Sequence, residues 1–295
     1  MQKIQFQADG HTLTGNLHLP ANFDDSKSYP AVVVDGSWTT VKEQMQGLYA
    51  ERLAKEGYVA LAFDHRYYGE SEGSPREFEN HNDKVADIKA AVTYLQSLPY
   101  VDNDRIGGLG VCASGAYMMQ ATAEDKRIRA YAGVVPWLMT PETAKGFYGG
   151  DEGTQDRIAK ADAAEKKRQT DGDIAYVPAY DPDNPEAAMF FPVDYYAKES
   201  RGKVPAWTNN FAVESWKYWL TYDGIEASKQ VDVPAIIVGS DKQFLPDGAK
   251  AALANFQGET EKLWLSDYEH DQFYDQPEVI DQAVASVEQF FDAHL

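Results

Sequence analysis

Short, continuous apolar runs separated by segments of helical spacing constrain the fold of this chain more than any other feature. Apolar runs of this length are typical of strands buried in a parallel sheet. Six such runs stand at residues 30–37, 58–66, 105–111, 129–137, 233–240 and 261–266. Because helical patterns alternate with them, the sequence predicts an α/β fold with a mostly parallel central sheet and helices on both faces. Alternating segments at 3–8 and 11–20, joined by Asp9-Gly10, predict an antiparallel hairpin at one edge.

Helical spacing predicts three long helices that cover this sheet, over residues 39–57, 82–99 and 277–291. Thr40 and Glu43 stand three residues apart at the start of the first helix. This spacing is typical of a capping box, in which each side chain accepts a hydrogen bond from the other residue's backbone N–H. We therefore expect the first helix to begin at this pair.

Residues 137–225 interrupt the alternation of strands and helices. They contain no strand-like run, a charged helical segment at 154–170, and 15 of the 37 aromatic residues. A long insertion of this kind is usually a functional lid. We expect a core of residues 1–136 and 226–295, with a helical cap of residues 137–225 over the carboxyl ends of the strands. The tryptophans expected to contact substrate are Trp137, Trp207 and Trp216. Alternatively, the aromatic residues form the cap's own core or the interface of a homodimer.

The composition excludes several classes of partner. The 47 acidic and 27 basic residues give a net charge of −20, which repels nucleic acid and anionic membranes. No apolar stretch is long enough to cross a membrane and no secretion signal stands at the start, so we expect a cytoplasmic protein. A single cysteine and six histidines without a pair at ligand spacing predict neither a disulfide nor a metal site.

That single cysteine stands in the segment GLGVCASGAY, directly after the predicted strand 105–111. A reactive side chain on a sharp strand-to-helix turn needs small residues two positions before and two positions after it. Gly110 and Ser114 flank Cys112 at these positions, and Gly115 allows the next helix to pack closely. A helix N-terminus and an imidazole would stabilise the thiolate. The pattern favours Cys112 as a nucleophile.

Three other interpretations of this segment remain. Residues 108–113 fit a G-x-G-x-x-A dinucleotide loop, but the next strand ends in VVPW, without the acidic residue that a ribose requires. Ser114 could be the nucleophile, although it would then lie inside the helix. Cys112 could also be a small apolar filler of the core.

A nucleophile of this type needs a base and an acid that orients the base. His270 lies between the last predicted strand and the last helix, where the chain returns to the active edge of the sheet. Asp241 lies just beyond the strand 233–240 and is our choice for the acid. Its rivals are Asp247, Asp267 and Asp271.

Acyl transfer also requires hydrogen-bond donors for the oxyanion. The backbone N–H after the nucleophile, that of Ala113, and one from the loop at Ser37 or Trp38 are expected in this role. Glu43 could alternatively approach the thiol as a modulating carboxylate. If the substrate is anionic, Lys42 and Arg66 are candidate partners for it.

Together these residues resemble the α/β-hydrolase fold and, within it, the dienelactone hydrolase-like branch, which carries a cysteine nucleophile. The resemblance rests on residues 37–45, 61–76, 105–117 and 267–275 and covers roughly the core. It implies Cys112, Asp241 and His270 as the triad and Ala113 as an oxyanion donor. The chain departs from the family at Ser114, where glycine is usual, and at Asp35-Gly36, where the family often has His-Gly. Its long aromatic cap is nearer to relatives that resemble polyketide transesterases.

The sequence therefore predicts a cofactor-independent hydrolase of a small-molecule carboxylic ester, lactone or thioester, acting through an acyl-cysteine intermediate. One alternative is an acyltransferase, transesterase or lactone-forming enzyme with the same triad. The other is a ligand-binding protein that keeps the fold without catalysis.

Overall fold

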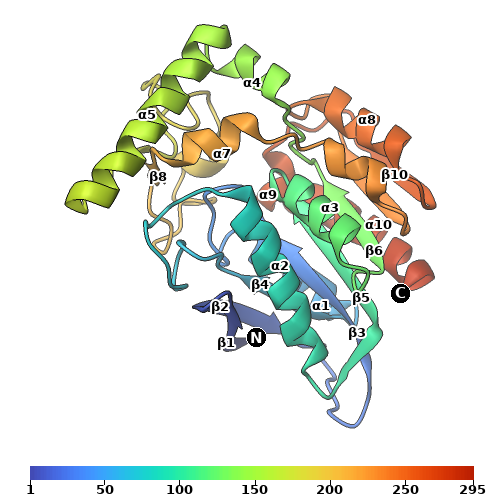
Figure 1. Cartoon of the computed structure of the whole chain (residues 1–295). Helices are drawn as coiled ribbons and strands as arrows, with labels where there is room; N and C mark the ends of the chain where they lie inside the picture. The colour runs from blue at the N-terminus through green and yellow to red at the C-terminus, as the bar shows by residue number, and fades with distance from the viewer.

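A single eight-stranded sheet forms the centre of the computed structural model, which describes all 295 residues (Figure 1). The strands lie in the order β1-β2-β4-β3-β5-β6-β9-β10. Their bounds are β1 Gln2–Ala8, β2 His11–His18, β3 Tyr29–Asp35, β4 Val59–Phe63, β5 Val101–Val111, β6 Ala130–Val134, β9 Ala235–Gly239 and β10 Thr260–Trp264. The β1–β2 hairpin and the β2–β4 pair are antiparallel, and the other neighbours are parallel. The predicted α/β fold with an antiparallel edge is confirmed.

Helices cover both faces of this sheet. Their bounds are α1 Met45–Lys55, α2 His81–Gln96, α3 Ser114–Glu124, the 3-10 helix η1 Glu226–Gln230, α8 Pro246–Asn255, α9 Gln272–Asp275 and α10 Pro277–His294. Successive residues of β5 point to opposite faces. A Cβ on Gly107 would meet Phe291 of α10, and one on Gly108 would meet Met118 of α3. Helices α3 and α10 therefore lie on opposite faces and pack directly against the middle of the sheet.

Residues 137–225, here called the cap segment, lie at the carboxyl ends of the parallel strands (Figure 1). Their elements are α4 Pro141–Phe147, α5 Gly150–Asp171, β7 Tyr176–Pro178, α6 Asp194–Ala197, β8 Asn210–Ala212 and α7 Ser215–Thr221. Trp207 Nε1 donates to the carbonyl of Thr39 over 2.9 Å, and Gln44 Nε2 donates to the carbonyl of Gly202 over 2.7 Å. These bonds hold the cap segment on the loop that follows β3.

Two local expectations are wrong. The first helix begins at Met45, not at a capping box, because the Thr40 hydroxyl donates to the carbonyl of Ser37 and Glu43 pairs with the Lys42 ammonium over 2.8 Å. The cap segment also contains two short strands, β7 and β8, which pair with each other. Strands of three residues are too short to produce a recognisable alternation in the sequence.

Candidate active site

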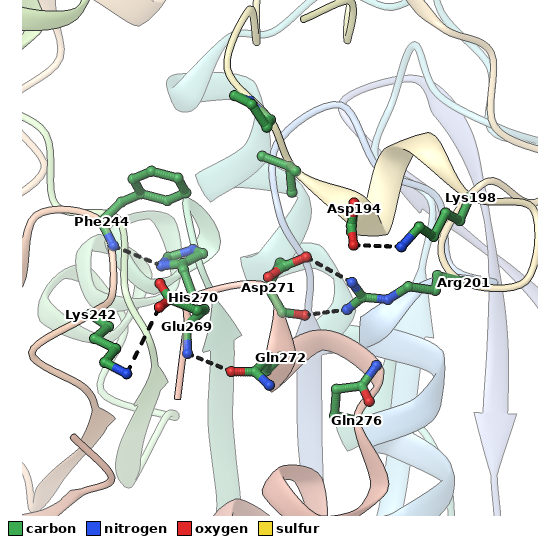
Figure 2. A pocket seen from close by; sticks show the side chains of 12 residues that line it. Asp194, Lys198, Arg201, Lys242, Phe244, Glu269, His270, Asp271, Gln272 and Gln276 are labelled. Carbon is green, nitrogen blue, oxygen red and sulfur yellow. Dashed lines mark hydrogen bonds and ion pairs between the residues drawn. The ribbon is translucent and has the colours of Figure 1, made fainter. Parts of the chain in front are cut away.

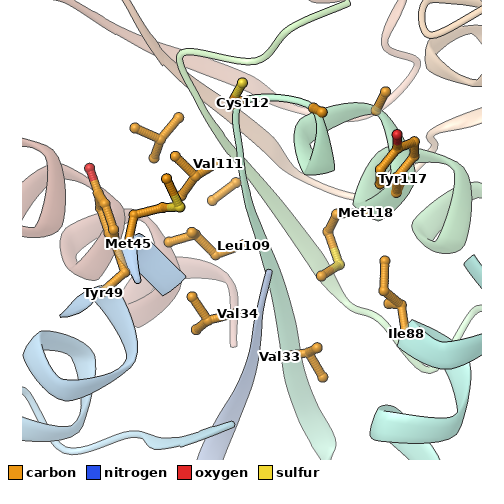
Figure 3. Close-up of a cluster of buried hydrophobic side chains, with 14 of the residues drawn as sticks. Val33, Val34, Met45, Tyr49, Ile88, Leu109, Val111, Cys112, Tyr117 and Met118 are labelled. Atoms are coloured by element: carbon orange, nitrogen blue, oxygen red, sulfur yellow. The ribbon is translucent and has the colours of Figure 1, made fainter. Parts of the chain in front are cut away.

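The turn between β5 and α3 holds Cys112 in a strained backbone conformation. Its φ is +59°, in the left-handed region that non-glycine residues rarely adopt and that often marks a functional site. A Cβ at Gly110 would lie 2.2 Å from the carbonyl oxygen of Ser114, and one at Gly115 would lie 2.5 Å from Pro136 Cβ. Steric crowding thus explains both glycines. The turn places the thiol at the carboxyl end of β5, as Figure 3 shows.

Donors surround the Cys112 thiol, which is only 3% exposed. The hydroxyl of Ser37 donates to Sγ over 3.2 Å. Burial raises the pKa of the thiol above its usual value, and it outweighs the opposing effect of donors from Ser37, Tyr274 and the N–H of Ala113. The thiol is therefore protonated at neutral pH in this structure.

His270 lines the same cavity as Cys112 and is also 3% exposed. Its Nδ1 accepts the backbone N–H of Phe244 over 3.2 Å, as Figure 2 shows. A neutral imidazole that accepts at Nδ1 carries its proton on Nε2. Burial lowers the pKa of His270 to about 3, so the ring is neutral at physiological pH. Nε2 itself has no hydrogen-bond partner in the protein.

The structure does not place Asp241 beside His270. The Asp241 carboxylate accepts from Lys250 Nζ over 2.8 Å and from Ser266 Oγ over 2.9 Å, and its side chain is 52% exposed. The hydrogen bond from Lys250 lowers the pKa of this carboxyl. A surface ion pair thus holds the Asp241 carboxylate at the protein surface. The backbone N–H of Phe244, and not a carboxylate, contacts Nδ1 of His270.

The rival acids do not contact the imidazole either. The Asp271 carboxylate binds the Arg201 guanidinium over 2.8 Å. Asp247 lies in the first turn of α8, and the backbone carbonyl of Asp267 accepts from Lys242. In this structure Cys112 and His270 line the same cavity, and no carboxylate contacts the imidazole.

The loop after β3 supplies the candidate oxyanion donors. The N–H of Ser37 donates to Met45 Sδ over 3.5 Å. The N–H of Trp38 has no acceptor in the protein, and that of Ala113 has none besides the Cys112 thiol. The Thr39 N–H donates to Glu79 Oε2 over 3.1 Å and so anchors this loop. Of the two predicted loop residues, Trp38 is the one whose backbone N–H remains available.

A small space, here called the inner cavity, is lined by both the Cys112 thiol and the His270 imidazole. Its volume is about 10 Å³, which accommodates about one water molecule. Besides Cys112 and His270, its principal lining residues are Ser37, Trp38, Trp137, Tyr196, Phe244 and Tyr274. The site is buried beneath the cap segment and is largely filled by aromatic side chains.

Of the three tryptophans expected at the substrate, only Trp137 lines the inner cavity. Trp207 holds the Thr39 carbonyl, and Trp216 packs against Phe211 and Tyr148 within the cap. The cap segment uses these two rings for its own packing and attachment, so neither lies at the inner cavity in this structure.

Sequence reasoning missed Tyr196 and Tyr274. Tyr274 follows His270 by four residues, a spacing that puts two side chains on one side of a helical turn. Its position near His270 could therefore have been predicted from the sequence. Tyr196 lies in α6 and reaches the inner cavity only through the tertiary fold of the cap segment. No local pattern marks it.

A larger polar cleft, here called the outer cleft, is also lined by His270 (Figure 2). It has a volume of about 580 Å³, and Val193, Phe244 and His270 line both this cleft and the inner cavity. The outer cleft carries Lys198 and Arg201, but Lys198 pairs with Asp194 and Arg201 with Asp271. The shared side chains form the wall between solvent and the thiol.

The candidate partners for an anionic substrate are engaged elsewhere. Lys42 is buried and contacts Asp64 over 2.7 Å, and Arg66 is buried and contacts Asp87 over 2.6 Å. Glu43 pairs with Lys42 and does not line the inner cavity. Neither Lys42 nor Arg66 is therefore placed to bind an anionic substrate at the inner cavity.

Two further features concern ligands and membranes. Glu259, Glu261 and His294 have the right types and spacing to hold a metal ion, but they lie at the surface near β10 and outside the inner cavity. None of the helices combines the length and apolar character needed to cross a bilayer.

Comparison with known proteins places the chain among hydrolases. The model of the "Dienelactone hydrolase family" matches residues 18–170. The uncharacterized protein YcjY of Escherichia coli (strain K12) is 32% identical over 72% of this chain and 71% of its own length. The crystal structure of the hypothetical protein PA2218 of Pseudomonas aeruginosa superposes with a TM-score of 0.85 at 30% identity, covering 100% of this chain and 93% of that one.

One further relative is named after an enzymatic activity. Thiohydrolase aneE of Aspergillus aculeatus is 38% identical over 44% of this chain and 39% of its own length. The family match covers half of the chain and includes the turn at Cys112. With the parallel sheet and its strand-to-helix turn, these similarities identify the chain as an α/β-hydrolase that belongs to the dienelactone hydrolase family.

Proposed function

We propose that this protein hydrolyses a carboxylic ester, lactone or thioester through an acyl-cysteine intermediate on Cys112. One observation carries the proposal: a buried thiol on a positive-φ turn shares a small cavity with an imidazole whose Nε2 has no partner. A nucleophile and a base that converge in a space shielded from water are the minimal machinery for acyl transfer.

The first step is proton transfer from the thiol to His270. The ring starts with its proton on Nε2, because Nδ1 accepts the N–H of Phe244. To accept at Nε2, the ring must carry that proton on Nδ1 instead, so Nδ1 has to separate from Phe244 and donate to an acceptor. We infer that the ring or the segment 240–245 shifts when substrate enters.

Attack by sulfur then forms the acyl-enzyme. The Cys112 Sγ–carbon bond forms as the carbonyl electron pair moves to oxygen, where the N–H groups of Ala113 and Trp38 stabilise the charge. The bond to the leaving oxygen or sulfur breaks, and that atom takes the proton from His270 Nε2. The products of this step are a free alcohol or thiol and a thioester on Cys112.

Water completes the reaction by the same route in reverse. A water molecule gives a proton to His270 Nε2 while its oxygen bonds to the acyl carbon. The carbon–sulfur bond breaks, and Cys112 regains the proton from the imidazole. The name thiohydrolase carried by aneE supports thioesters as one substrate class.

Acyl transfer to an alcohol is a second candidate, and the aromatic lining of the inner cavity favours it. Apolar rings around the acyl-enzyme exclude water and so limit hydrolysis. Incubation with and without an added alcohol separates the two functions. Hydrolysis gives the free acid in both cases, whereas transfer gives a new ester only when the alcohol is present.

Intact mass spectrometry after brief incubation with activated acyl esters tests the proposal. The wild type should gain one acyl group on Cys112, and Cys112→Ala should gain none and lose turnover. Ser114→Ala is the matched control, because Ser114 is buried two residues away and should leave acylation unchanged. Cys112→Ser tests whether oxygen can replace sulfur.

An adduct on another residue, or full turnover by Cys112→Ala, would overturn the assignment. Ligand binding by the wild type without adduct or turnover would instead support the third alternative, a binding protein on the same fold.

A further inference from the structure

Two buried hydrogen-bond donors of the inner cavity lack a hydrogen bond of ordinary length and angle. Trp137 is 7% exposed and Tyr196 is 2% exposed, and both line the cavity that holds Cys112. The Trp137 Nε1 atom has no hydrogen-bond partner in the protein, and the Tyr196 hydroxyl has none of ordinary length and angle, although the Ser37 hydroxyl lies close enough to interact with it. Buried polar groups are nearly always paired, so each exception needs an explanation.

Comparable donors in the cap segment are satisfied. Trp207 Nε1 donates to Thr39 over 2.9 Å, and Trp219 Nε1 donates to the hydroxyl of Tyr148 over 3.0 Å. The fold therefore pairs other indole N–H groups in this region. The indole N–H of Trp137, which lines the inner cavity, is not paired.

The chemistry of these donors defines what they can bind. An indole N–H only donates, so its partner must be an acceptor. The reacting carbonyl oxygen is assigned to the N–H groups of Trp38 and Ala113, which leaves Trp137 and Tyr196 for a second oxygen. No lysine or arginine lines the inner cavity, and an unpaired carboxylate would be strongly disfavoured there. The second oxygen should therefore be uncharged.

We propose that Trp137 and Tyr196 bind a neutral oxygen of the acyl group, such as an ether, hydroxyl or keto oxygen beyond the reacting carbonyl. This inference rests on the proposed acyl-cysteine function and names its substrate class. The apolar rings of Phe191 and Phe244 surround the rest of the acyl chain. In the resting enzyme a single water molecule could make the same bonds, and the substrate oxygen would replace it.

Matched substrates test this proposal. Phenyl methoxyacetate and phenyl butanoate have equally long acyl chains and differ by one oxygen in place of a methylene group. Phenyl 3-methoxypropanoate and phenyl pentanoate move the oxygen one atom further from the carbonyl. The ratio of kcat/KM within each pair is measured for wild type, Trp137→Phe and Tyr196→Phe. Comparing ratios between proteins cancels the intrinsic reactivity of the esters.

In at least one pair, each variant should reduce the preference for the ether substrate about tenfold, the effect of one net hydrogen bond. Trp216→Phe and Tyr148→Phe are the matched controls, since they make the same changes in the cap segment outside the inner cavity. These controls should keep the wild-type ratio. A general loss of packing would change both members of a pair alike.

Binding without catalysis provides a second measurement. In Cys112→Ala, the indole N–H resonance of Trp137 is identified by its loss when Trp137→Phe is added. Titration with methoxyacetamide or 3-methoxypropanamide should shift this resonance, and butanamide or pentanamide should not.

The outcomes separate the two proposals. If Cys112 is acylated but neither variant changes either ratio, the oxygen-binding role is overturned and the proposed function stands. If Cys112 is never acylated, the proposed function fails and the titration decides the inference alone. A Trp137 resonance that does not distinguish ether amides from alkyl amides would then overturn it.

Discussion

The backbone N–H of Phe244 donates to Nδ1 of His270 over 3.2 Å, and this contact determines where the imidazole carries its proton. In a triad, a carboxylate at that position holds the ring with its proton on Nδ1 and stabilises the charged imidazolium. A backbone donor does the opposite, because it favours a proton on Nε2. The structure thus presents a resting pair that must rearrange before Cys112 can transfer its proton to His270.

The position of Asp241 makes its role testable. Its exposed carboxylate pairs with Lys250, and surface ion pairs contribute little to stability. Because Lys250 and Ser266 hold the carboxylate at the surface, Asp241→Asn should change kcat/KM less than about fivefold, whereas loss of a triad acid costs about 10⁴. Lys250→Ala is the control for the ion pair itself. A loss of a thousandfold or more in Asp241→Asn alone would mean that Asp241 reaches His270 in the working enzyme.

Burial of His270 predicts a pH dependence of stability. The pKa of His270 falls from 6.5 to about 3 on folding, so between these values the unfolded chain binds a proton that the folded chain does not. The free energy of unfolding should therefore decrease as pH falls from 6.5, by up to about 1.4 kcal/mol per pH unit. Between pH 7 and 4.5, urea unfolding should show a larger loss for wild type than for His270→Gln, by about 2–3 kcal/mol. Parallel losses would contradict this prediction.

The sequence determined the sheet and the turn because both depend on short-range sterics and apolar periodicity. Gly110 must be small whatever lies elsewhere in the fold, so the position of Cys112 could be predicted from its neighbours in sequence. The placement of Asp241 could not be predicted in this way. It depends on which of several polar groups contacts its carboxylate in the folded protein: Lys250, Ser266 or the imidazole. The position of Tyr196 could not be predicted either, because it too depends on contacts between segments that are distant in the sequence.

The hydroxyl of Ser37 should ease ionisation of the thiol. It donates to Cys112 Sγ over 3.2 Å and lowers the thiol pKa, against the larger effect of burial. Ser37→Ala should therefore raise the pKa of Cys112 further and slow alkylation by iodoacetamide at pH 8, by about three- to tenfold for one lost hydrogen bond. Alkylation rates measured between pH 7 and 10.5 give the comparison. Ser266→Ala, which removes an exposed hydroxyl, is the control, and equal rates for all three proteins would contradict the prediction.

Glu79 should act as a positioning residue for the oxyanion loop. Its carboxylate is buried, accepts the N–H of Thr39 over 3.1 Å and pairs with the buried Lys84 over 2.8 Å. Glu79→Gln leaves the Lys84 charge without a partner and should lower stability by about 3–5 kcal/mol. It should also lower kcat more than it raises KM, because the N–H of Trp38 acts mainly on the transition state. Glu124→Gln, at an exposed ion pair, is the control. A stability loss with unchanged kcat would limit Glu79 to a structural role.

Phe244 should control access to the thiol. Its ring lines both the outer cleft and the inner cavity, so Phe244→Ala should open the wall between them and increase the rate of Cys112 alkylation several-fold. Water that enters would also raise the pKa of His270 from about 3 toward 6.5, since burial is the cause of its low value.

The pKa of His270 is measured by nuclear magnetic resonance of its ring. The rate of Cys112 alkylation measures the access of reagent to the thiol independently. The variant keeps the backbone N–H at position 244, so the contact with Nδ1 is not removed by the substitution itself. Phe190→Ala is the matched control, because Phe190 belongs to the cap segment but lines neither space. An unchanged alkylation rate and an unchanged His270 pKa in Phe244→Ala would mean that substrate reaches Cys112 by another path. In that case, separation of the whole cap segment from the loop after β3 would be the remaining way to expose the thiol.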